Sequence, residues 1–232
     1  MQIKKAMILA AGYGKRMLPL TKKIPKPLIK IGSKNLLERA IELLATIGVN
    51  EIVLNGYYLF HEIEKFFKTK NYDISITLIQ EKKLLDTGGG IFNTTKQFKD
   101  KPFFVLNPDT VWTKNYHKEL QSLENFYLLN KKPVLLLVDK KKSFDKSFKG
   151  DFNFSNQQII TREENNNYIF TGAQIVNRSI FENVDKEIFS MNLIWDDLIK
   201  KKALLGQKSN EDFFHVNSFK VFKEIEKLKF ID

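Results

Sequence analysis

Strand-length apolar runs recur along the first half of this chain, and amphipathic stretches separate them. The runs that predict strands are short and rich in branched or aromatic side chains: residues 6–9, 51–54, 74–79, 103–106 and 133–138. The stretches between them space apolar residues three and four apart, as helices do: residues 35–47, 59–67, 86–98 and 116–129. This alternation predicts an α/β fold whose sheet is mostly parallel and covered by helices on both faces.

The second half of the chain has a different pattern, which starts with a polar loop over residues 140–149. Helices are predicted over residues 193–201 and from Phe219 onward. Several short segments predict antiparallel strands that flank the main sheet: residues 150–154, 158–160, 168–170 and 171–176. A length of 232 residues suits one α/β domain with an ample core, so we expect residues 1–232 to form a single domain.

Composition argues against several classes of function. The chain has no cysteine, which excludes disulfides and thiol chemistry. Its N-terminus carries only a strand-length apolar run, so we expect no signal peptide and no membrane span, and a cytoplasmic location. The net charge of +11 comes almost entirely from lysines spread over the chain, with only four arginines. Because no basic stripe with interleaved aromatic residues occurs, we expect no nucleic-acid partner.

The loop after the first strand has the chemistry of a polyphosphate site. Its small residues leave backbone N–H groups open to phosphate oxygens: Ala10, Ala11, Gly12 and Gly14. The cations Lys15 and Arg16 follow directly, and Lys26 lies further on between two prolines that restrict its approach. The spacing differs from a P-loop, which ends in Gly-Lys-Ser/Thr, and from the dinucleotide fingerprint, whose third glycine is replaced by Met17.

This stretch is similar to the signature of the sugar-1-phosphate nucleotidyltransferases. The pattern Leu-x-x-Gly-x-Gly-x-Arg-Met, followed by Pro-Leu-Thr and Pro-Lys-Pro-Leu, is complete between Leu9 and Leu28. The resemblance implies a Rossmann-like fold of the nucleotide-diphospho-sugar transferase type. Residues 1–139 would be its nucleotide-binding half, and residues 140–232 a sugar-binding half with a small antiparallel part. It also implies the reaction, in which a sugar 1-phosphate and a nucleoside triphosphate give a nucleotide sugar and pyrophosphate, with Mg²⁺ as cofactor.

The resemblance assigns roles to individual residues. By this resemblance Arg16 and Lys26 would be the catalytic cations: Arg16 would neutralise the departing β- and γ-phosphates, and Lys26 would bridge the α-phosphate and the incoming phosphate. The nucleotide-binding residues that it implies are Ala10, Ala11, Gly12, Gly14, Lys15, Gln80, Thr87 and Gly88. The sugar-binding residues that it implies are Gly150, Asp151, Thr171 and Gly172. No general base is expected, because the attacking phosphate is already anionic.

Asp109 follows the predicted strand 103–106, at the edge where open α/β sheets bind ligands. A carboxylate there, together with substrate phosphate oxygens, suits Mg²⁺, and Asp109 matches the family's metal-binding aspartate. The family's second metal-binding aspartate is replaced by His215, and its Gly-Thr pair by Asn217-Ser218. Histidine suits Zn, Cu or Ni better than Mg²⁺. His215 therefore either hydrogen-bonds a phosphate or a metal-bound water, or packs as an ordinary buried side chain.

The substrates are suggested by the Thr-Gly-Gly-Gly-Ile turn at residues 87–91, which most resembles small bacterial members of the family. It favours UTP with N-acetylmuramate 1-phosphate, and GTP with mannose 1-phosphate next. A nucleotide-binding regulator without catalysis remains an alternative because of His215, and a phosphocholine cytidylyltransferase would share the same loop. A Rossmann oxidoreductase would need an acidic residue after the second strand, which ends instead at Leu54-Asn55-Gly56. We make no prediction of the oligomeric state.

Overall fold

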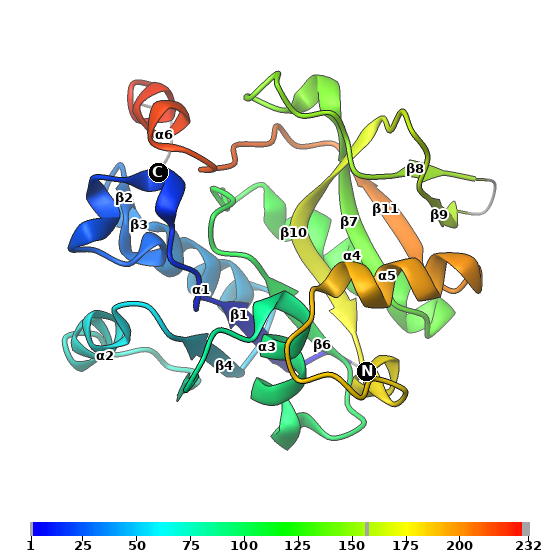
Figure 1. The fold of residues 1–232 in the computed structure, drawn as a ribbon, viewed down its shortest axis with the longest axis horizontal. Helices are drawn as coiled ribbons and strands as arrows, with labels where there is room; N and C mark the ends of the chain where they lie inside the picture. Colours follow the sequence, from blue (N-terminus) through cyan, green and yellow to red (C-terminus); the bar gives the residue numbers. More distant parts are fainter. Residues whose placement is uncertain (1, 156–157, 229–232) are drawn as a thin grey trace.

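The computed structural model describes residues 2–155 and 158–228, which form a central sheet with helices packed around it (Figure 1). The strands of the sheet are β1 (Lys5–Leu9), β4 (Glu51–Gly56), β5 (Ser75–Gln80), β6 (Phe103–Leu106), β7 (Val134–Asp139), β10 (Tyr168–Val176) and β11 (Leu205–Ser209). The α-helices are α1 (Leu36–Thr46), α2 (Phe60–Lys68), α3 (Asp86–Thr94), α4 (Tyr116–Asn130), α5 (Met191–Lys200) and α6 (Phe219–Glu226).

The order of the strands explains where a ligand can bind. Across the sheet the order is β11-β7-β10-β6-β1-β4-β5, and β1 is parallel to both of its neighbours, β4 and β6. The chain passes from β1 to β4 on one side and later reaches β6 on the other, so the strand order reverses beside β1. The loops that follow β1 and β6 therefore meet at one edge of the sheet, where open α/β sheets bind ligands.

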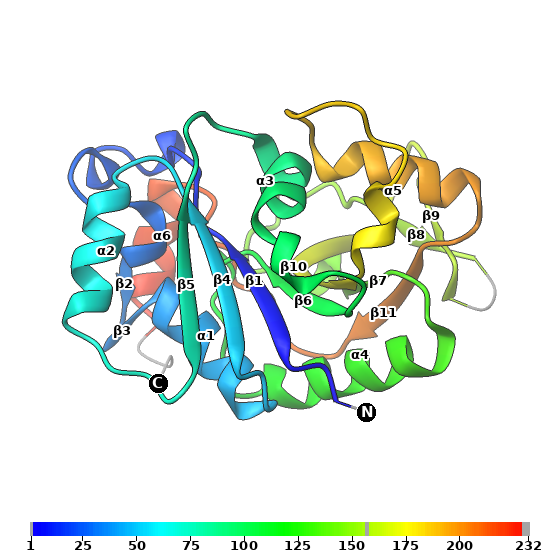
Figure 2. The same cartoon turned by 90° about the horizontal axis from the view of Figure 1, so that it is seen from below.

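Each face of the sheet has its own hydrophobic core. Ala6 and Ile8 of β1 pack in one core with α1, α2 and α4, whereas Met7 packs in the other with α3 and α5. Figure 2 shows α3 and α5 above the sheet and α1 and α4 below it. Burial on both faces explains why the strands appear in the sequence as continuous apolar runs. The predicted fold class, a mostly parallel sheet covered on both faces, is confirmed.

Helix α1 begins and ends at local signals. The Asn35 side chain accepts a hydrogen bond from the Glu38 N–H at 2.8 Å, and the Glu38 carboxylate accepts one from the Asn35 N–H at 2.9 Å. This reciprocal capping box satisfies backbone donors that the helix itself leaves free. Beyond the helix, Gly48 takes a left-handed conformation with a φ of 86°, which turns the chain toward β4.

Strand β10 is the main departure from the sequence-based expectation. Residues 168–176 were expected to flank the sheet, but β10 lies inside it, antiparallel to both β6 and β7. Its pairing with β7 shifts register between Phe170 and Gln174, which marks a bulge. A small separate sheet pairs β8 (Asn153–Phe154) with β9 (Ile160–Thr161), as the predicted short antiparallel segments suggest. The polar edge strand β11 was not predicted.

A third apolar cluster fastens the C-terminal helix to the segment after β1. Val221, Phe222 and Ile225 of α6 pack with Met17 and Ile29. The hairpin of β2 (Lys30–Ile31) and β3 (Lys34–Asn35) contributes Ile31 to the same cluster. This packing brings residues 215–218, which precede α6, next to the loops that follow β1 and β6.

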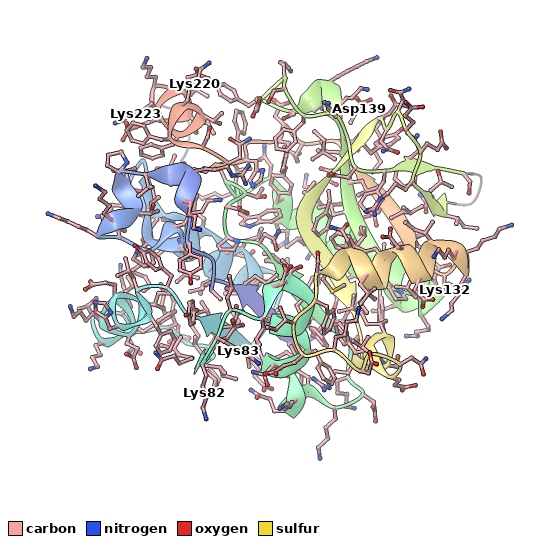
Figure 3. All side chains as sticks on the ribbon, viewed as in Figure 1. Lys82, Lys83, Lys132, Asp139, Lys220 and Lys223 are labelled. Atoms are coloured by element: carbon pink, nitrogen blue, oxygen red, sulfur yellow. The ribbon has the colours of Figure 1, made fainter. Side chains whose placement is uncertain are left out.

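The lysines labelled in Figure 3 lie in three separate parts of the molecule: Lys82 and Lys83 after β5, Lys132 after α4, and Lys220 and Lys223 on α6. These positions do not form one stripe, in keeping with the dispersed lysines of the sequence. Within the described residues, no helix combines the length and apolar character needed to cross a membrane.

Candidate active site

The loop that follows β1 is held open by two glycines in different ways. A Cβ added at Gly12 would have no atom within 4 Å, so the backbone here faces open space. Gly14 instead has a φ of 61°, and a Cβ there would lie 2.9 Å from Thr21 Cγ2 and 3.1 Å from Lys26 Cβ. The Thr21 hydroxyl donates to the Gly14 carbonyl at 2.9 Å. Gly12 therefore leaves room for a ligand, and Gly14 permits the turn that brings Lys26 close.

A cavity of about 660 Å³ lies between the loops that follow β1 and β6, and we call it the β1–β6 cavity. It contains most of the residues that the sequence predicts for the nucleotide and its phosphates. Its lining comprises Leu9, Ala10, Ala11, Gly12, Gly14, Lys15, Arg16, Met17, Lys26, Pro27, Asn55, Leu84, Asp86, Thr87, Asn107, Pro108, Asp109, Ile188 and Asn217. The size is appropriate for a small organic ligand.

The cations of this cavity differ in their surroundings. Arg16 lies on a single 3₁₀ turn, Lys15–Met17, and none of the described residues binds its exposed guanidinium. Lys15 is also exposed, with its ammonium 5.3 Å from the centre of the Tyr13 ring. Lys26 is half-buried and donates to Asp109 Oδ2 at 2.6 Å. Arg16 is therefore available for an anion, whereas Lys26 is already oriented by a carboxylate.

Asp109 lies at the meeting point of two segments. The Val216 N–H donates to the Asp109 carbonyl at 2.8 Å, and the Val111 N–H donates to the Phe214 carbonyl at 2.8 Å. Burial alone would raise the pKa of Asp109, but the charges of Lys26 and His215 hold it well below its usual range. The carboxylate is therefore ionised at neutral pH.

His215 contacts Asp109 directly. Its Nε2 lies 3.1 Å from Asp109 Oδ2, the same oxygen that Lys26 contacts. Its ring stacks on Phe148 with a centroid separation of 5.6 Å and an interplanar angle of 25°. The buried Nδ1 atom has no hydrogen-bond partner within the described parts of the chain. His215 thus packs on an aromatic ring and holds one oxygen of Asp109.

The donor set fits a magnesium ion that also binds substrate phosphates. Asp109 Oδ1 is buried and has no hydrogen-bond partner among the described residues, so one carboxylate oxygen remains for a ligand. Among these residues there is no cluster of three or more His, Cys, Asp or Glu side chains that could hold a metal ion. Mg²⁺ typically uses one or two protein carboxylates and completes its shell with phosphate oxygens and water.

A buried hydrogen-bond network connects the loop to α3. The Ala10 N–H donates to Asn55 Oδ1 at 2.9 Å, and Asn55 Nδ2 donates to Glu81 Oε1 at 2.6 Å. Glu81 Oε2 accepts from the Leu85 N–H at 3.2 Å, just before α3 begins. Burial raises the pKa of Glu81, although both donors oppose the shift. Because every member is paired, this network fixes the loop relative to the Thr87 turn.

Two predicted nucleotide-binding residues are not part of the cavity lining. Gln80 is exposed at the end of the edge strand β5. Gly88 packs inside the molecule, since a Cβ there would lie 2.4 Å from the Phe189 ring. Its neighbour Thr87 does line the cavity, and the Thr87 hydroxyl accepts from the Met191 N–H at 2.9 Å. Roles for Gln80 and Gly88 in nucleotide binding remain predictions.

The four predicted sugar-binding residues gather beside β10, outside the lining of the β1–β6 cavity. Asp151 accepts from the Phe170 N–H at 2.9 Å, and Gly150 has a φ of 86° and lies against Asn166. Thr171 and Gly172 form the bulge of β10, where the Gly172 carbonyl accepts from the Asn107 N–H at 2.8 Å. The bulge thus abuts the loop after β6. Sugar binding by these residues remains a prediction.

Sequence reasoning missed several cavity residues as functional candidates. Asn55, Asn107 and Asn217 each lie next to the end of a strand or a predicted loop motif, and a polar residue in such a position is the signal that could have identified them. Asp86 adopts a left-handed conformation with a φ of 61°, a rare state for a residue other than glycine. Ile188 comes from a loop far along the chain, and nothing local in the sequence marks it.

The comparisons with known proteins agree with this geometry. Residues 5–127 match the family described as Nucleotidyl transferase. The chain is 30% identical over 212 residues to D-glycero-alpha-D-manno-heptose 1-phosphate guanylyltransferase of Campylobacter jejuni, covering 91% of this chain and 85% of that protein. The chain therefore belongs to the nucleotidyl transferase family. It is an enzyme of this class, a nucleotidyltransferase, and the family expected from the signature is confirmed.

Other relatives match only part of their length. Mannose-1-phosphate guanyltransferase of Neurospora crassa is 40% identical over 109 residues, which are 45% of this chain and 30% of that protein.

Among solved structures, UDP-glucose pyrophosphorylase complexed with UDP-glucose has a TM-score of 0.80 and 18% identity, with 97% of both chains covered. HddC from Yersinia pseudotuberculosis complexed with GMP-PN has a TM-score of 0.76 and 24% identity, covering 97% of this chain and 99% of that one. At these identities the solved structures establish the fold alone.

Proposed function

We propose that this protein transfers a nucleotidyl group from a nucleoside triphosphate to a sugar 1-phosphate, releasing pyrophosphate. The observation that carries the proposal is the convergence of open backbone, a free Arg16 and the Lys26–Asp109 pair on one cavity, all within the described residues. Phosphoryl chemistry of this kind requires positioning and charge stabilisation rather than a protein nucleophile. The names of the relatives, which are guanylyltransferases of sugar phosphates, support the same class of reaction.

Each residue has a role that follows from its position. The backbone from Ala11 to Gly14 binds the triphosphate through its N–H groups, for which Gly12 leaves space. Arg16, which no described residue pairs with, stabilises the negative charge of the departing pyrophosphate. Lys26 draws the α-phosphate and the attacking phosphate together, and Asp109 keeps its ammonium pointed at them.

Asp109 Oδ1 is a protein oxygen that would hold Mg²⁺. The ion would supply charge neutralisation on the phosphate oxygens. The attacking group is an anionic phosphate oxygen, which forms a bond to the α-phosphorus as the bond to the β-phosphate oxygen breaks. No proton has to be removed from it, so the site needs no general base.

For the substrates, we propose GTP with a manno-configured sugar 1-phosphate first. This pairing follows the Campylobacter relative, which matches over most of both chains, and the mannose-1-phosphate guanyltransferases. UTP with N-acetylmuramate 1-phosphate remains the second candidate, supported by the Thr-Gly-Gly-Gly-Ile turn at residues 87–91.

The test is pyrophosphate release by the purified protein in the presence of Mg²⁺. GTP, UTP, CTP and dTTP are each combined with a panel of sugar 1-phosphates and with phosphocholine, and each nucleotide is also run without an acceptor. The proposal predicts release that depends on one nucleotide and one sugar phosphate. Nucleotide binding without release from any pair would favour a non-catalytic regulator, the alternative that His215 suggests. Release with phosphocholine alone would identify a cytidylyltransferase of another class.

A further inference from the structure

His215 occupies the position of the expected second metal-binding aspartate, but it has no oxygen to offer a metal ion and its Nε2 atom already contacts Asp109. A second oxygen ligand would therefore have to come from another residue. His215 Nε2 and Lys26 Nζ both contact Asp109 Oδ2, so His215 is used to hold the first carboxylate. Its other nitrogen lies buried on a ring stacked against Phe148. Imidazole nitrogen is also a poor ligand for Mg²⁺, which prefers oxygen.

Asn217, two residues further on, has the missing oxygen. Its Oδ1 atom is buried and lacks a hydrogen-bond partner in the described part of the chain, as does Asp109 Oδ1. Both residues line the β1–β6 cavity. Buried acceptors in native proteins are almost always paired, so two unpaired oxygens that line one cavity point to a ligand that they share.

The orientation of the Asn217 amide is set by a carboxylate behind it. Asn217 Nδ2 donates to Asp145 Oδ2 at 2.7 Å, which leaves Oδ1 as the unpaired end among the described residues. Asp145 Oδ1 is occupied by the N–H and hydroxyl of Ser147, at 2.9 Å and 2.6 Å. Asp145 is therefore an acceptor only, and residue 217 has to present a donor toward it. An aspartate at position 217 would place two carboxylates together, whereas asparagine satisfies Asp145 and still offers an oxygen.

The segment that carries Asn217 is held against Asp109 by the backbone. An isolated antiparallel bridge pairs Thr110 with His215, and the Val216 N–H donates to the Asp109 carbonyl at 2.8 Å, so the two segments run side by side at this point. The side-chain oxygens of Asp109 and Asn217 thus come from adjacent, mutually bonded segments.

We propose that Asn217 Oδ1 and Asp109 Oδ1 together form the protein part of a divalent-cation site, with Asn217 replacing the second carboxylate. The physiological meaning of this site rests on the proposed function, but its existence does not. An asparagine in place of an aspartate removes one negative charge, which predicts weaker cation binding by the free protein and greater reliance on substrate phosphates.

The probe is Mn²⁺ alone, measured by the enhancement of water-proton relaxation as it binds the purified full-length protein. The proposal predicts that Asn217→Ala weakens Mn²⁺ binding about tenfold or more, whereas His215→Gln, which keeps a donor for Asp109, changes it by less than about threefold. Circular dichroism and thermal unfolding establish that each variant is folded.

A second experiment exchanges the carboxylate and the amide between positions 145 and 217. The double variant Asp145→Asn/Asn217→Asp keeps the hydrogen bond between the two side chains with its direction reversed, and it places a carboxylate at position 217. It is expected to bind Mn²⁺ about tenfold more tightly than the wild type, and more tightly than Asn217→Asp alone. The double variant also remains informative if Asn217→Ala proves unstable.

Several results would overturn the proposal. The first is that the wild-type protein does not bind Mn²⁺, and the second is that Asn217→Ala leaves the Mn²⁺ affinity unchanged. The third is that His215→Gln loses more Mn²⁺ affinity than Asn217→Ala does. If Asn217→Ala raised only the KM for the sugar phosphate, Asn217 would bind a hydroxyl instead of the cation. Absence of pyrophosphate release would contradict the proposed function but not the cation site, because the Mn²⁺ measurement requires no substrate.

Discussion

Two regions of the molecule contribute to the site in contrasting ways. The first is the segment Leu9–Leu28, and the second consists of the segments around residues 150–172 and 213–218. Within the first segment, the small residues and cations that the sequence predicts all reach one cavity. The later segments place Thr171 and Gly172 in a strand bulge and His215 against Asp109. The predicted phosphate-binding residues are thus local in the chain, whereas the predicted metal-binding and sugar-binding residues come from segments far apart in the sequence.

The largest predicted effect concerns the local segment. Arg16→Ala and Lys26→Ala should each lower turnover about 10²–10³-fold, because each removes a charge that stabilises the transition state. Thermal unfolding should change little for Arg16→Ala, since this side chain is exposed and unpaired among the described residues. Steady-state kinetics with the preferred substrate pair measure the effect.

Lys23→Ala is the matched control, because Lys23 is an exposed lysine of the same segment and does not line the cavity. Its turnover should remain near that of the wild type. Near-normal turnover in Arg16→Ala or Lys26→Ala would remove that residue from the mechanism and weaken the contrast between the two regions.

Substitutions at the two glycines of the loop should affect different properties: Gly14 the stability of the fold, and Gly12 the binding of the nucleotide. Gly14→Ala should reduce the free energy of unfolding by about 1–2 kcal/mol, since alanine is strained at a φ of 61° and would press on Thr21 and Lys26. Gly12→Ala has space for its methyl group, so stability should change by less than about 0.5 kcal/mol. The added methyl should nevertheless raise the KM for the nucleotide, because it occupies space that a phosphate approaches. Denaturant unfolding and steady-state kinetics on both variants measure the two effects. Equal losses of stability and equal changes in KM for the two variants would contradict these separate roles of Gly12 and Gly14.

Glu81 tests whether the buried network holds the loop in place. A glutamine side chain at this position would turn an NH₂ group, which cannot accept, toward one of the two donors, whereas the hydroxyl oxygen of protonated Glu81 still can. Glu81→Gln should therefore cost about 1–3 kcal/mol of stability at acidic pH. The pKa of Glu81 is raised by burial, so the folded chain binds its proton more tightly than the unfolded chain. The stability that Glu81 contributes is therefore full below the unfolded-state pKa and falls as the pH rises through the folded-state pKa.

The destabilisation by Glu81→Gln should accordingly be larger at acidic pH than at neutral pH. Denaturant unfolding across this range measures it, and Glu64→Gln, at an exposed site on α2, is the control. If the stability lost on Glu81→Gln grew with rising pH, the assigned direction of the Glu81 pKa shift would be wrong.

The smallest effect is expected on the sugar side. If Asp151 binds the sugar, Asp151→Asn should raise the KM for the sugar phosphate about threefold to tenfold and leave the KM for the nucleotide unchanged. Initial rates with each substrate varied in turn separate the two constants. No change in either constant would place the sugar elsewhere than beside β10.

The extent to which the sequence predicts this molecule follows from how local each feature is. The β1 loop is predictable because its small residues, cations and prolines act within one short stretch of chain. The central position of β10 depends on pairing with β6 and β7, which apolar pattern alone does not specify, and β11 is too polar and short to be recognised.

The same reasoning explains the missed site residues. Asn55 acquires its role only through its contact with Glu81, 26 positions away in the segment after β5. Asn217 becomes distinctive only because Asp145, 72 positions away, accepts its amide hydrogen. The sequence marks the replaced aspartate at position 215, but only the fold shows which neighbour has a free oxygen.

The most direct test of the central claim is an isotope measurement. The preferred sugar 1-phosphate is prepared with ¹⁸O in its phosphate oxygens and incubated with the protein, Mg²⁺ and the unlabelled nucleoside triphosphate, and both products are examined by mass spectrometry. Attack of the sugar phosphate on the α-phosphorus predicts that the nucleotide sugar retains all of the label and that the pyrophosphate contains none. Label in the pyrophosphate, or nucleotide monophosphate formed in place of a nucleotide sugar, would contradict the assignment of nucleotidyl transfer to this protein.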